Sequence, residues 1–310
     1  MMNGNKIGLS QADALSTACA LKDYLEIFKV HLCLYIGLSA IFGHVMARQT
    51  FSFESLFLGF FVMVLACGAA VLNNIQDREY DSFFLRTCNR SLPQERVPIF
   101  HAKMIAMLMI GCGLSGLLFA TGVVPFFCGM VAVICYNALY TPLKKQTLLA
   151  IVPGTLSGML PPLIGWAGTE KAMSDPDILM IMIIFGLWQV PHFFILLLKT
   201  KKGKSDKPGL DRLPCFSTLF SKNEMKLQIL IWTSLYSLAI VLFLMNGSIK
   251  NHLLSIASGL NAVGITVLIS SIIFKHKNQN ISIAFAAINI SILFFMGAGI
   301  CDKCDLNSFF

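Results

Sequence analysis

The chain has 310 residues, of which 56% are hydrophobic and 13% are charged, and its formal net charge is +8. Soluble domains are about 25% charged, so this composition, with a mean hydropathy of +0.72, indicates a polytopic membrane protein. The positive charge would suggest nucleic acid binding only if it formed a patch on a soluble domain. No stretch of the sequence is long enough for such a domain, so we expect no nucleic acid partner.

The first residues are mildly polar and include Lys6 and Asp13. They lack the apolar core of a secretion signal and the arginine-rich, acid-free character of a mitochondrial presequence. This pattern favours a bacterial protein. We expect three parts: an N-terminal segment at 1–24, a single transmembrane domain at 25–300 and a short outer-side tail at 301–310.

Nine stretches are apolar over the roughly 17–25 residues that a membrane-spanning helix needs. They lie at about 27–47, 53–73, 102–121, 123–140, 148–168, 178–198, 227–246, 252–273 and 280–300. The third and fourth meet at Gly122-Val123-Val124-Pro125, which predicts a tight hairpin. The predicted fold class is an all-α membrane protein with about nine transmembrane helices.

Lysine and arginine predict the orientation, because they concentrate on the cytoplasmic side of membrane proteins. One assignment gathers nearly all of the 24 Lys and Arg residues on one side, together with the adjoining span edges. That side comprises the N-terminal segment and the loops at 74–101, 141–147, 199–226 and 274–279. The exceptions are Arg48, Lys171, Lys250 and Lys303. We therefore expect a cytoplasmic N-terminus and, with nine spans, a C-terminus outside.

The most informative stretch follows the second apolar run and reads Asn73-Asn74-Ile75-Gln76-Asp77-Arg78-Glu79-Tyr80-Asp81. Polar groups this dense at the end of a membrane helix carry a large energetic penalty and indicate a function. Asn73, Asp77 and Asp81 are four residues apart, so a helix places them on one face. Three oxygen ligands suit Mg2+, which binds through one or two carboxylates and substrate phosphates. We predict that these three residues are catalytic and bind the metal.

Two arginines close behind this stretch supply donors for phosphate. Arg86 and Arg90 repeat the four-residue spacing, and their forked guanidinium groups match phosphate oxygens. The alternative interpretation is a solvated loop with ordinary charges. That alternative explains neither the spacing nor the carboxylates beside the arginines.

A second cytoplasmic loop, residues 199–214, is rich in lysine and also contains Asp206 and Asp211. A lysine run beside a membrane is typical of an anchor to anionic lipid. Two carboxylates opposite the first cluster would instead hold a second metal ion or the same diphosphate. Both interpretations stand at this point.

Some spans contain helix-breaking or polar residues. The fifth carries Pro153, Gly154, Gly158, Pro161, Pro162 and Gly165, a pattern tolerated where helices pack closely or line a cavity. The sixth ends in Trp188-Gln189-Val190-Pro191-His192-Phe193. Gln189 and His192 are candidates for substrate contact, and an interhelical hydrogen bond is the alternative for Gln189.

Four motifs together resemble the UbiA superfamily of intramembrane prenyltransferases and, within it, the protoheme IX farnesyltransferases (heme O synthases). The first is Asn73-Asn74-x-x-Asp77-x-x-x-Asp81 with Arg86-Thr87-x-x-Arg90-x-Leu92-Pro93. The others are Tyr140-Thr141-x-Leu143-Lys144-Lys145, Gly158-x-x-Pro161-Pro162-Leu163-Ile164-Gly165-Trp166 and Trp188-Gln189-x-Pro191-His192-Phe193. In the loop after the sixth span, Asp206 is the best match to an Asp-Tyr pair of the heme branch, and the Tyr is absent.

The resemblance implies a helical bundle around a central cavity open to the cytoplasm. It implies Mg2+-dependent transfer of a farnesyl group from farnesyl diphosphate to a vinyl group of heme b, for heme-copper oxidase biogenesis. The implied diphosphate-binding residues are Arg86, Arg90, Lys144 and Asp206. The implied substrate cavity contains Asn74, Tyr140, Trp188, Gln189 and His192.

The resemblance also implies a location and partners. We expect a multi-pass protein of the bacterial inner membrane that contacts membrane lipid and neighbouring heme-biogenesis or oxidase proteins. Polyprenyl transfer to an aromatic quinone precursor is the nearest alternative. A membrane transporter and a non-catalytic heme-binding assembly factor are alternatives of another class. The grouping of charges at one membrane face and the lack of paired inverted repeats argue against a transporter.

Overall fold

The computed structural model describes residues 21–85, 87–200, 220–274 and 280–304, and within these ranges the chain is helical and contains no strands. Residues 21–28 form a helical stretch before the first long helix. The elements that follow are α2 (Val30–Arg48), α3 (Phe53–Asp81), α4 (Ile99–Thr121), α5 (Val123–Val133), η1 (Ile134–Tyr140), α6 (Thr141–Leu143), η2 (Leu148–Ala150), α7 (Ile151–Ala167), α8 (Pro176–Thr200), α10 (Lys222–Met245), α11 (His252–Phe274) and α12 (Ile281–Lys303).

Each of the nine predicted apolar stretches contains a helix, in the predicted order. Among the described residues, eight segments are long and apolar enough to cross a membrane, and α5, η1 and α6 together make one of them, Val123–Leu143. The predicted fifth span contains α7, which has 17 residues and is shorter than the other eight. The all-α membrane bundle is confirmed. At its end, α12 extends through Lys303 into the predicted tail.

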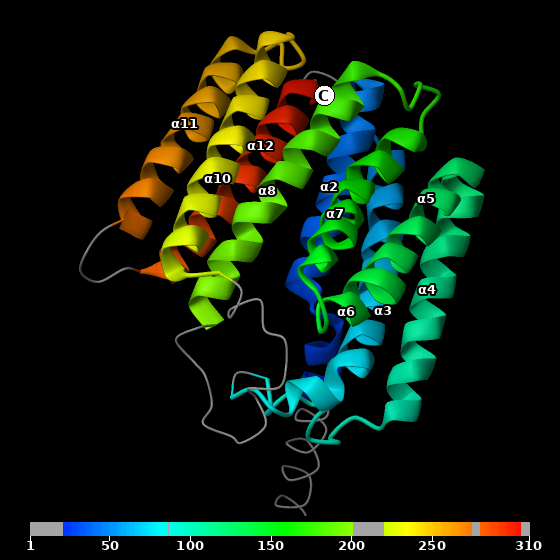
Figure 1. The fold of residues 1–310 in the computed structure, drawn as a ribbon. Coiled ribbons are helices and arrows are strands. Elements are labelled where there is room, and N and C mark those ends of the chain that lie inside the picture. The colour runs from blue at the N-terminus through cyan, green and yellow to red at the C-terminus, as the bar shows by residue number, and fades with distance from the viewer. Residues whose placement is uncertain (1–20, 86, 201–219, 275–279, 305–310) are drawn as a thin grey trace, which may run out of the picture.

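The long helices lie side by side and alternate in direction (Figure 1). The predicted hairpin between the third and fourth spans is confirmed at Gly122, which ends α4 and precedes α5 with a φ of 102°. Glycine adopts this φ without the steric penalty of a Cβ. The last turns of α3, the start of α4 and α6 all lie at one end of the bundle, where the predicted catalytic residues are found (Figure 1).

Helices α2 and α7 approach each other closely through glycines. A Cβ on Gly43 would lie 2.0 Å from the carbonyl oxygen of Pro162, and one on Gly165 would lie 1.9 Å from that of Ala40. Small residues allow such contact between membrane helices. Pro161, also inside α7, lines a cavity. The glycines and prolines of the fifth span therefore serve both predicted purposes, since they allow close helix packing and line a cavity.

Aromatic packing connects the two ends of the sequence. Phe295 on α12 lies 5.4 Å from Phe42 on α2 and 5.5 Å from Phe243 on α10, measured between ring centroids. All three side chains are fully buried. By contrast, large apolar side chains such as Phe119 and Leu260 are exposed, as expected for a surface that faces lipid.

Candidate active site

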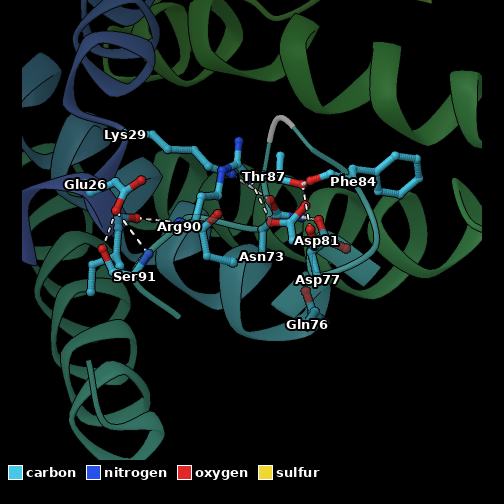
Figure 2. A network of polar contacts seen from close by, with 12 residues as sticks. Glu26, Lys29, Asn73, Gln76, Asp77, Asp81, Phe84, Thr87, Arg90 and Ser91 are labelled. Carbon is cyan, nitrogen blue, oxygen red and sulfur yellow. Dashed lines mark hydrogen bonds and ion pairs between the residues drawn. The ribbon is translucent and has the colours of Figure 1, made fainter. Parts of the chain in front are cut away.

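The last two turns of α3 carry three buried polar side chains on one face (Figure 2). Asn73, Asp77 and Asp81 are only 2%, 6% and 8% exposed. Asn73 Nδ2 donates a hydrogen bond of 3.0 Å to Asp77 Oδ2. The three side chains therefore share one face of α3, as their four-residue spacing predicts, and this face points into the protein.

Two lysines neutralise Asp77. Lys144 forms an ion pair with Asp77 Oδ2, and Lys145 Nζ lies 3.0 Å from Oδ1. Oδ1 is buried, and no hydrogen bond to it is present among the described residues. This oxygen therefore keeps an unused acceptor position.

Asp81 is held by the loop that follows α3. Arg90 Nη1 donates to Asp81 Oδ2 at 2.7 Å, and Thr87 Oγ1 donates to the main-chain oxygen of Asp81 at 2.8 Å. Figure 2 shows Arg90 reaching from this loop to the carboxylate. The hydrogen bond is charge-assisted, and both side chains are mostly shielded from solvent.

A third lysine, at the start of α2, reaches the polar face of α3. Lys29 immediately precedes α2, and its Nζ donates a hydrogen bond of 2.8 Å to Asn73 Oδ1. Lys29, Arg90, Lys144 and Lys145 thus surround the two carboxylates. The excess of positive charge favours a multiply charged anion at this end of the bundle.

The helix between α5 and α6 widens into a π-helix, η1, beside the carboxylates. Its widened turn allows Thr141 Oγ1 to donate to the carbonyl of Tyr136 at 2.8 Å while accepting from Asn73 Nδ2 at 3.0 Å. Tyr136 and Tyr140 stack with centroids 5.7 Å apart, and Lys144 Nζ lies 5.4 Å from the Tyr140 centroid. Single π-helical turns are frequent at functional sites.

A large apolar cavity begins at these tyrosines and continues between α7, α8 and α12. Its volume is about 1700 Å³ including the part that opens outward. Most of its lining is apolar, with residues such as Leu65, Ile164 and Phe185. Its polar lining residues include Tyr136, Tyr140, Gln189, His192 and Asn289.

Four of the five residues predicted for the substrate cavity line it: Tyr140, Trp188, Gln189 and His192. Gln189 also makes the alternative contact, because its Nε2 donates to the carbonyl of Thr155 at 3.2 Å. Gly158 makes room for this amide, since a Cβ there would lie 1.7 Å from Gln189 Nε2.

Asn74, the fifth residue, does not line this cavity, and its role stays a prediction. Its Nδ2 donates to the carbonyl of Ile27 at 2.8 Å, and it lines a smaller pocket of about 520 Å³ with Lys29, Asp81 and Arg90. The cause is the helical rotation of about 100° per residue, which turns Asn74 away from the face of Asn73. The predicted residues Arg86 and Asp206 lie outside the described residues.

Sequence reasoning missed Lys29, Lys145 and Asn289 as site residues. A signal existed for Lys29, because an isolated lysine next to an apolar span has an energetic penalty that a partner must offset. Lys145 follows Lys144 directly, and nothing local distinguishes the two. Asn289 lies in the last span without a recognisable motif.

The oxygen donors fit a hard cation. Among the described residues, no three or more His, Cys, Asp or Glu side chains form a metal-binding group. A metal here would have two carboxylates and the Asn73 amide oxygen, and would complete its shell with substrate oxygens, as Mg2+ commonly does. Asp77 Oδ1 supports this fit, because it is buried and accepts no hydrogen bond, with only the ion pair to Lys145 beside it.

Comparisons with known proteins show similarity in sequence and in fold. Residues 36–296 match the model of the UbiA prenyltransferase family. A protoheme IX farnesyltransferase from Geobacter sulfurreducens is 38% identical over 172 residues, or 55% of this chain, and the chain spans 63% of that relative. Protoheme IX farnesyltransferase 1 of Pseudomonas putida is 32% identical over 68% of this chain and 71% of its own length. The structure of a UbiA homolog from Archaeoglobus fulgidus bound to GPP and Mg2+ superimposes with a TM-score of 0.67 at 12% identity, over 91% of this chain and 99% of that one.

Proposed function

Since the chain belongs to the UbiA prenyltransferase family, we propose that it transfers the farnesyl group of farnesyl diphosphate to a vinyl group of heme b, which gives heme O. The observation that carries this proposal is the group of four cations around two buried carboxylates. This group adjoins a large apolar cavity through Lys144, which lies beside the cavity-lining Tyr140. The names of the curated relatives support the choice of donor and acceptor.

The residues of α3 would hold Mg2+ in this reaction through Asn73 Oδ1, Asp77 and Asp81. When bound, the ion supplies positive charge that stabilises the leaving diphosphate. Lys144, Lys145 and Arg90 pair with the carboxylates in the structure. Their charges would turn to the diphosphate oxygens, where electrostatic stabilisation contributes most to such a reaction.

The cavity walls protect the farnesyl group as its C–O bond breaks. Apolar side chains exclude water from an allylic cation that water would otherwise capture. The stacked rings of Tyr136 and Tyr140 line the cavity, and aromatic faces stabilise a nearby cation. The heme vinyl group would then form a bond to the allylic carbon that the diphosphate leaves. Water would add to the cation that remains on the other vinyl carbon and lose a proton, which gives the hydroxyethylfarnesyl substituent.

The proposed location is the inner membrane of a bacterium, with the N-terminus and the carboxylate site on the cytoplasmic side. The lysine and arginine distribution supports this orientation. Farnesyl diphosphate is charged and would reach the site from the cytoplasm. Heme-biogenesis or oxidase proteins are the proposed neighbours, since heme O is an apolar product that serves heme-copper oxidases.

Acceptor competition tests the proposal. Membranes that contain the protein are supplied with labelled farnesyl diphosphate, Mg2+ and either heme b or 4-hydroxybenzoate. We expect label in a heme product only, and none after chelation of the metal. Label in 4-hydroxybenzoate would instead assign the chain to quinone synthesis, and the absence of any labelled product in either tube would contradict prenyl transfer.

A further inference from the structure

His192 on α8 and Asn289 on α12 face each other across the cavity wall. His192 Nδ1 and Asn289 Oδ1 are 3.1 Å apart, and both residues line the cavity. The proposed prenyl transfer to heme gives neither residue a task. The arrangement nevertheless determines which nitrogen of the imidazole carries the proton.

The amide of Asn289 has only one possible orientation. Its Nδ2 donates to the carbonyl of Phe285, and a carbonyl can only accept, so the amide nitrogen must lie on that side. The amide oxygen therefore faces His192, and an oxygen acceptor requires a proton on Nδ1. In the neutral imidazole the other nitrogen, Nε2, then carries a lone pair.

That lone pair is available. No described residue bonds to Nε2, and the atom is not among the fully buried polar atoms without a partner. Because the ring lines the cavity, Nε2 is accessible from it. The wall thus presents a neutral nitrogen donor to whatever the cavity holds.

Two aromatic rings fix the imidazole plane. The centroid of His192 lies 5.0 Å from that of Trp188 and 4.7 Å from that of Phe285. Trp188 is itself anchored, since its Nε1 donates to the carbonyl of Ile288 at 3.0 Å. An imidazole oriented by a hydrogen bond at Nδ1 is the usual form of a histidine metal ligand.

We propose that His192 Nε2 is an axial ligand of the iron of an iron porphyrin bound in the cavity. This inference rests on the proposed function, in which heme b is the acceptor, and it adds the means by which the protein holds it. Imidazole is a common protein ligand of heme iron. An axial bond would hold the porphyrin against α8, in the cavity that Tyr140 lines beside Lys144.

Heme titration of the full-length protein in lipid nanodiscs tests the inference, with the Soret band as readout. The wild-type protein should give the band of a histidine-ligated heme. His192→Ala should lose that band and regain it when free imidazole is added. His31→Ala is the matched control, because His31 is exposed on α2 and away from the cavity, and it should titrate as the wild type does.

Substitutions at Asn289 separate ligation from a merely structural role. Asn289→Ala should weaken heme binding about tenfold, as loss of the residue that orients a histidine ligand does. Asn289→Asp should keep the histidine band and lower the reduction potential of the bound heme, because a carboxylate at Nδ1 makes the ligand more basic.

Two results would overturn the inference: a wild-type spectrum without histidine ligation, or the same band and affinity in His192→Ala. Its failure can be distinguished from failure of the proposed function. If the protein farnesylates heme but its heme spectrum does not depend on His192, the proposed function stands and only the proposal of an axial ligand fails. If the heme spectrum depends on His192 but no farnesyl group is transferred, the axial ligand stands and only the proposed reaction fails.

Discussion

A hydrogen bond of 2.8 Å from the ammonium of Lys29 to Asn73 Oδ1 connects the start of α2 to the last turns of α3. The same oxygen is one of the three proposed metal ligands. A metal at this oxygen would repel the Lys29 ammonium, and the displaced cation would then face the incoming diphosphate. Lys29 and the metal thus compete for Asn73 Oδ1, although both attract the diphosphate.

This competition predicts opposite effects of Lys29→Met on two ligands. Mg2+ alone should bind more tightly, because its rival is gone. Farnesyl diphosphate should bind roughly tenfold more weakly, as expected for loss of one charge-assisted hydrogen bond of about 1.5–3 kcal/mol. Calorimetric titration measures both, with Lys171→Met in an exposed loop as the control. Parallel changes for the two ligands would contradict the competition.

Asp77→Asn and Asp81→Asn should each lower the transfer rate by at least about 10²-fold, the loss seen when one electrostatic contact to a developing charge is removed. Both variants should still insert into the membrane. Glu79→Gln, on the same turn but exposed, should keep its rate. Wild-type turnover by both aspartate variants in a Mg2+-dependent membrane assay would refute the metal role.

Lys144→Ala should weaken binding of inorganic diphosphate and raise the KM for farnesyl diphosphate, because Lys144 is one of the two cations paired with Asp77. Lys144→Arg should recover part of the affinity. Lys222→Ala removes an exposed lysine at the start of α10 and should leave the KM unchanged. An equal effect of the two alanine variants would reduce the role of Lys144 to general surface charge.

Gly165→Ala should lower the stability of the protein by about 1–3 kcal/mol, the usual effect of overpacking. The added Cβ would lie 1.9 Å from the Ala40 carbonyl and would force α2 and α7 apart. Gly297→Ala on α12 is the matched control, since nothing lies within 4 Å of its added Cβ. Thermal unfolding in detergent measures the difference, and equal midpoints for the two variants would contradict this packing.

Asp302→Ala should lower stability by about 3 kcal/mol without changing the transfer rate of the folded protein. Asp302 accepts from the backbone nitrogens of Lys250 and Asn251, at 3.0 and 2.6 Å, and pairs with the buried Lys303 at 2.9 Å. Removing one partner leaves a buried charge uncompensated. Denaturant unfolding, with Asp302→Asn as the milder variant, checks the loss, and unchanged stability would show that the contact contributes little.

The sequence predicted what depends on local spacing. Apolar length indicated the spans, and the four-residue intervals placed Asn73, Asp77 and Asp81 on one face. It did not predict contacts between distant elements, because no local pattern shows that Lys29 meets Asn73 or that Asn289 meets His192. The π-helix at Ile134–Tyr140 also has no simple sequence signal, and the roles of Arg86 and Asp206 stay predictions.

Mass analysis of extracted hemes tests the central claim most directly. Cells that lack their own heme O synthase are compared with and without this protein, and with Asp77→Asn. The account predicts a heme heavier than heme b by one farnesyl group plus one hydroxyl group, present only with the wild-type protein. Heme b alone in the wild-type sample, or the heavier heme in equal amount from Asp77→Asn, would contradict it.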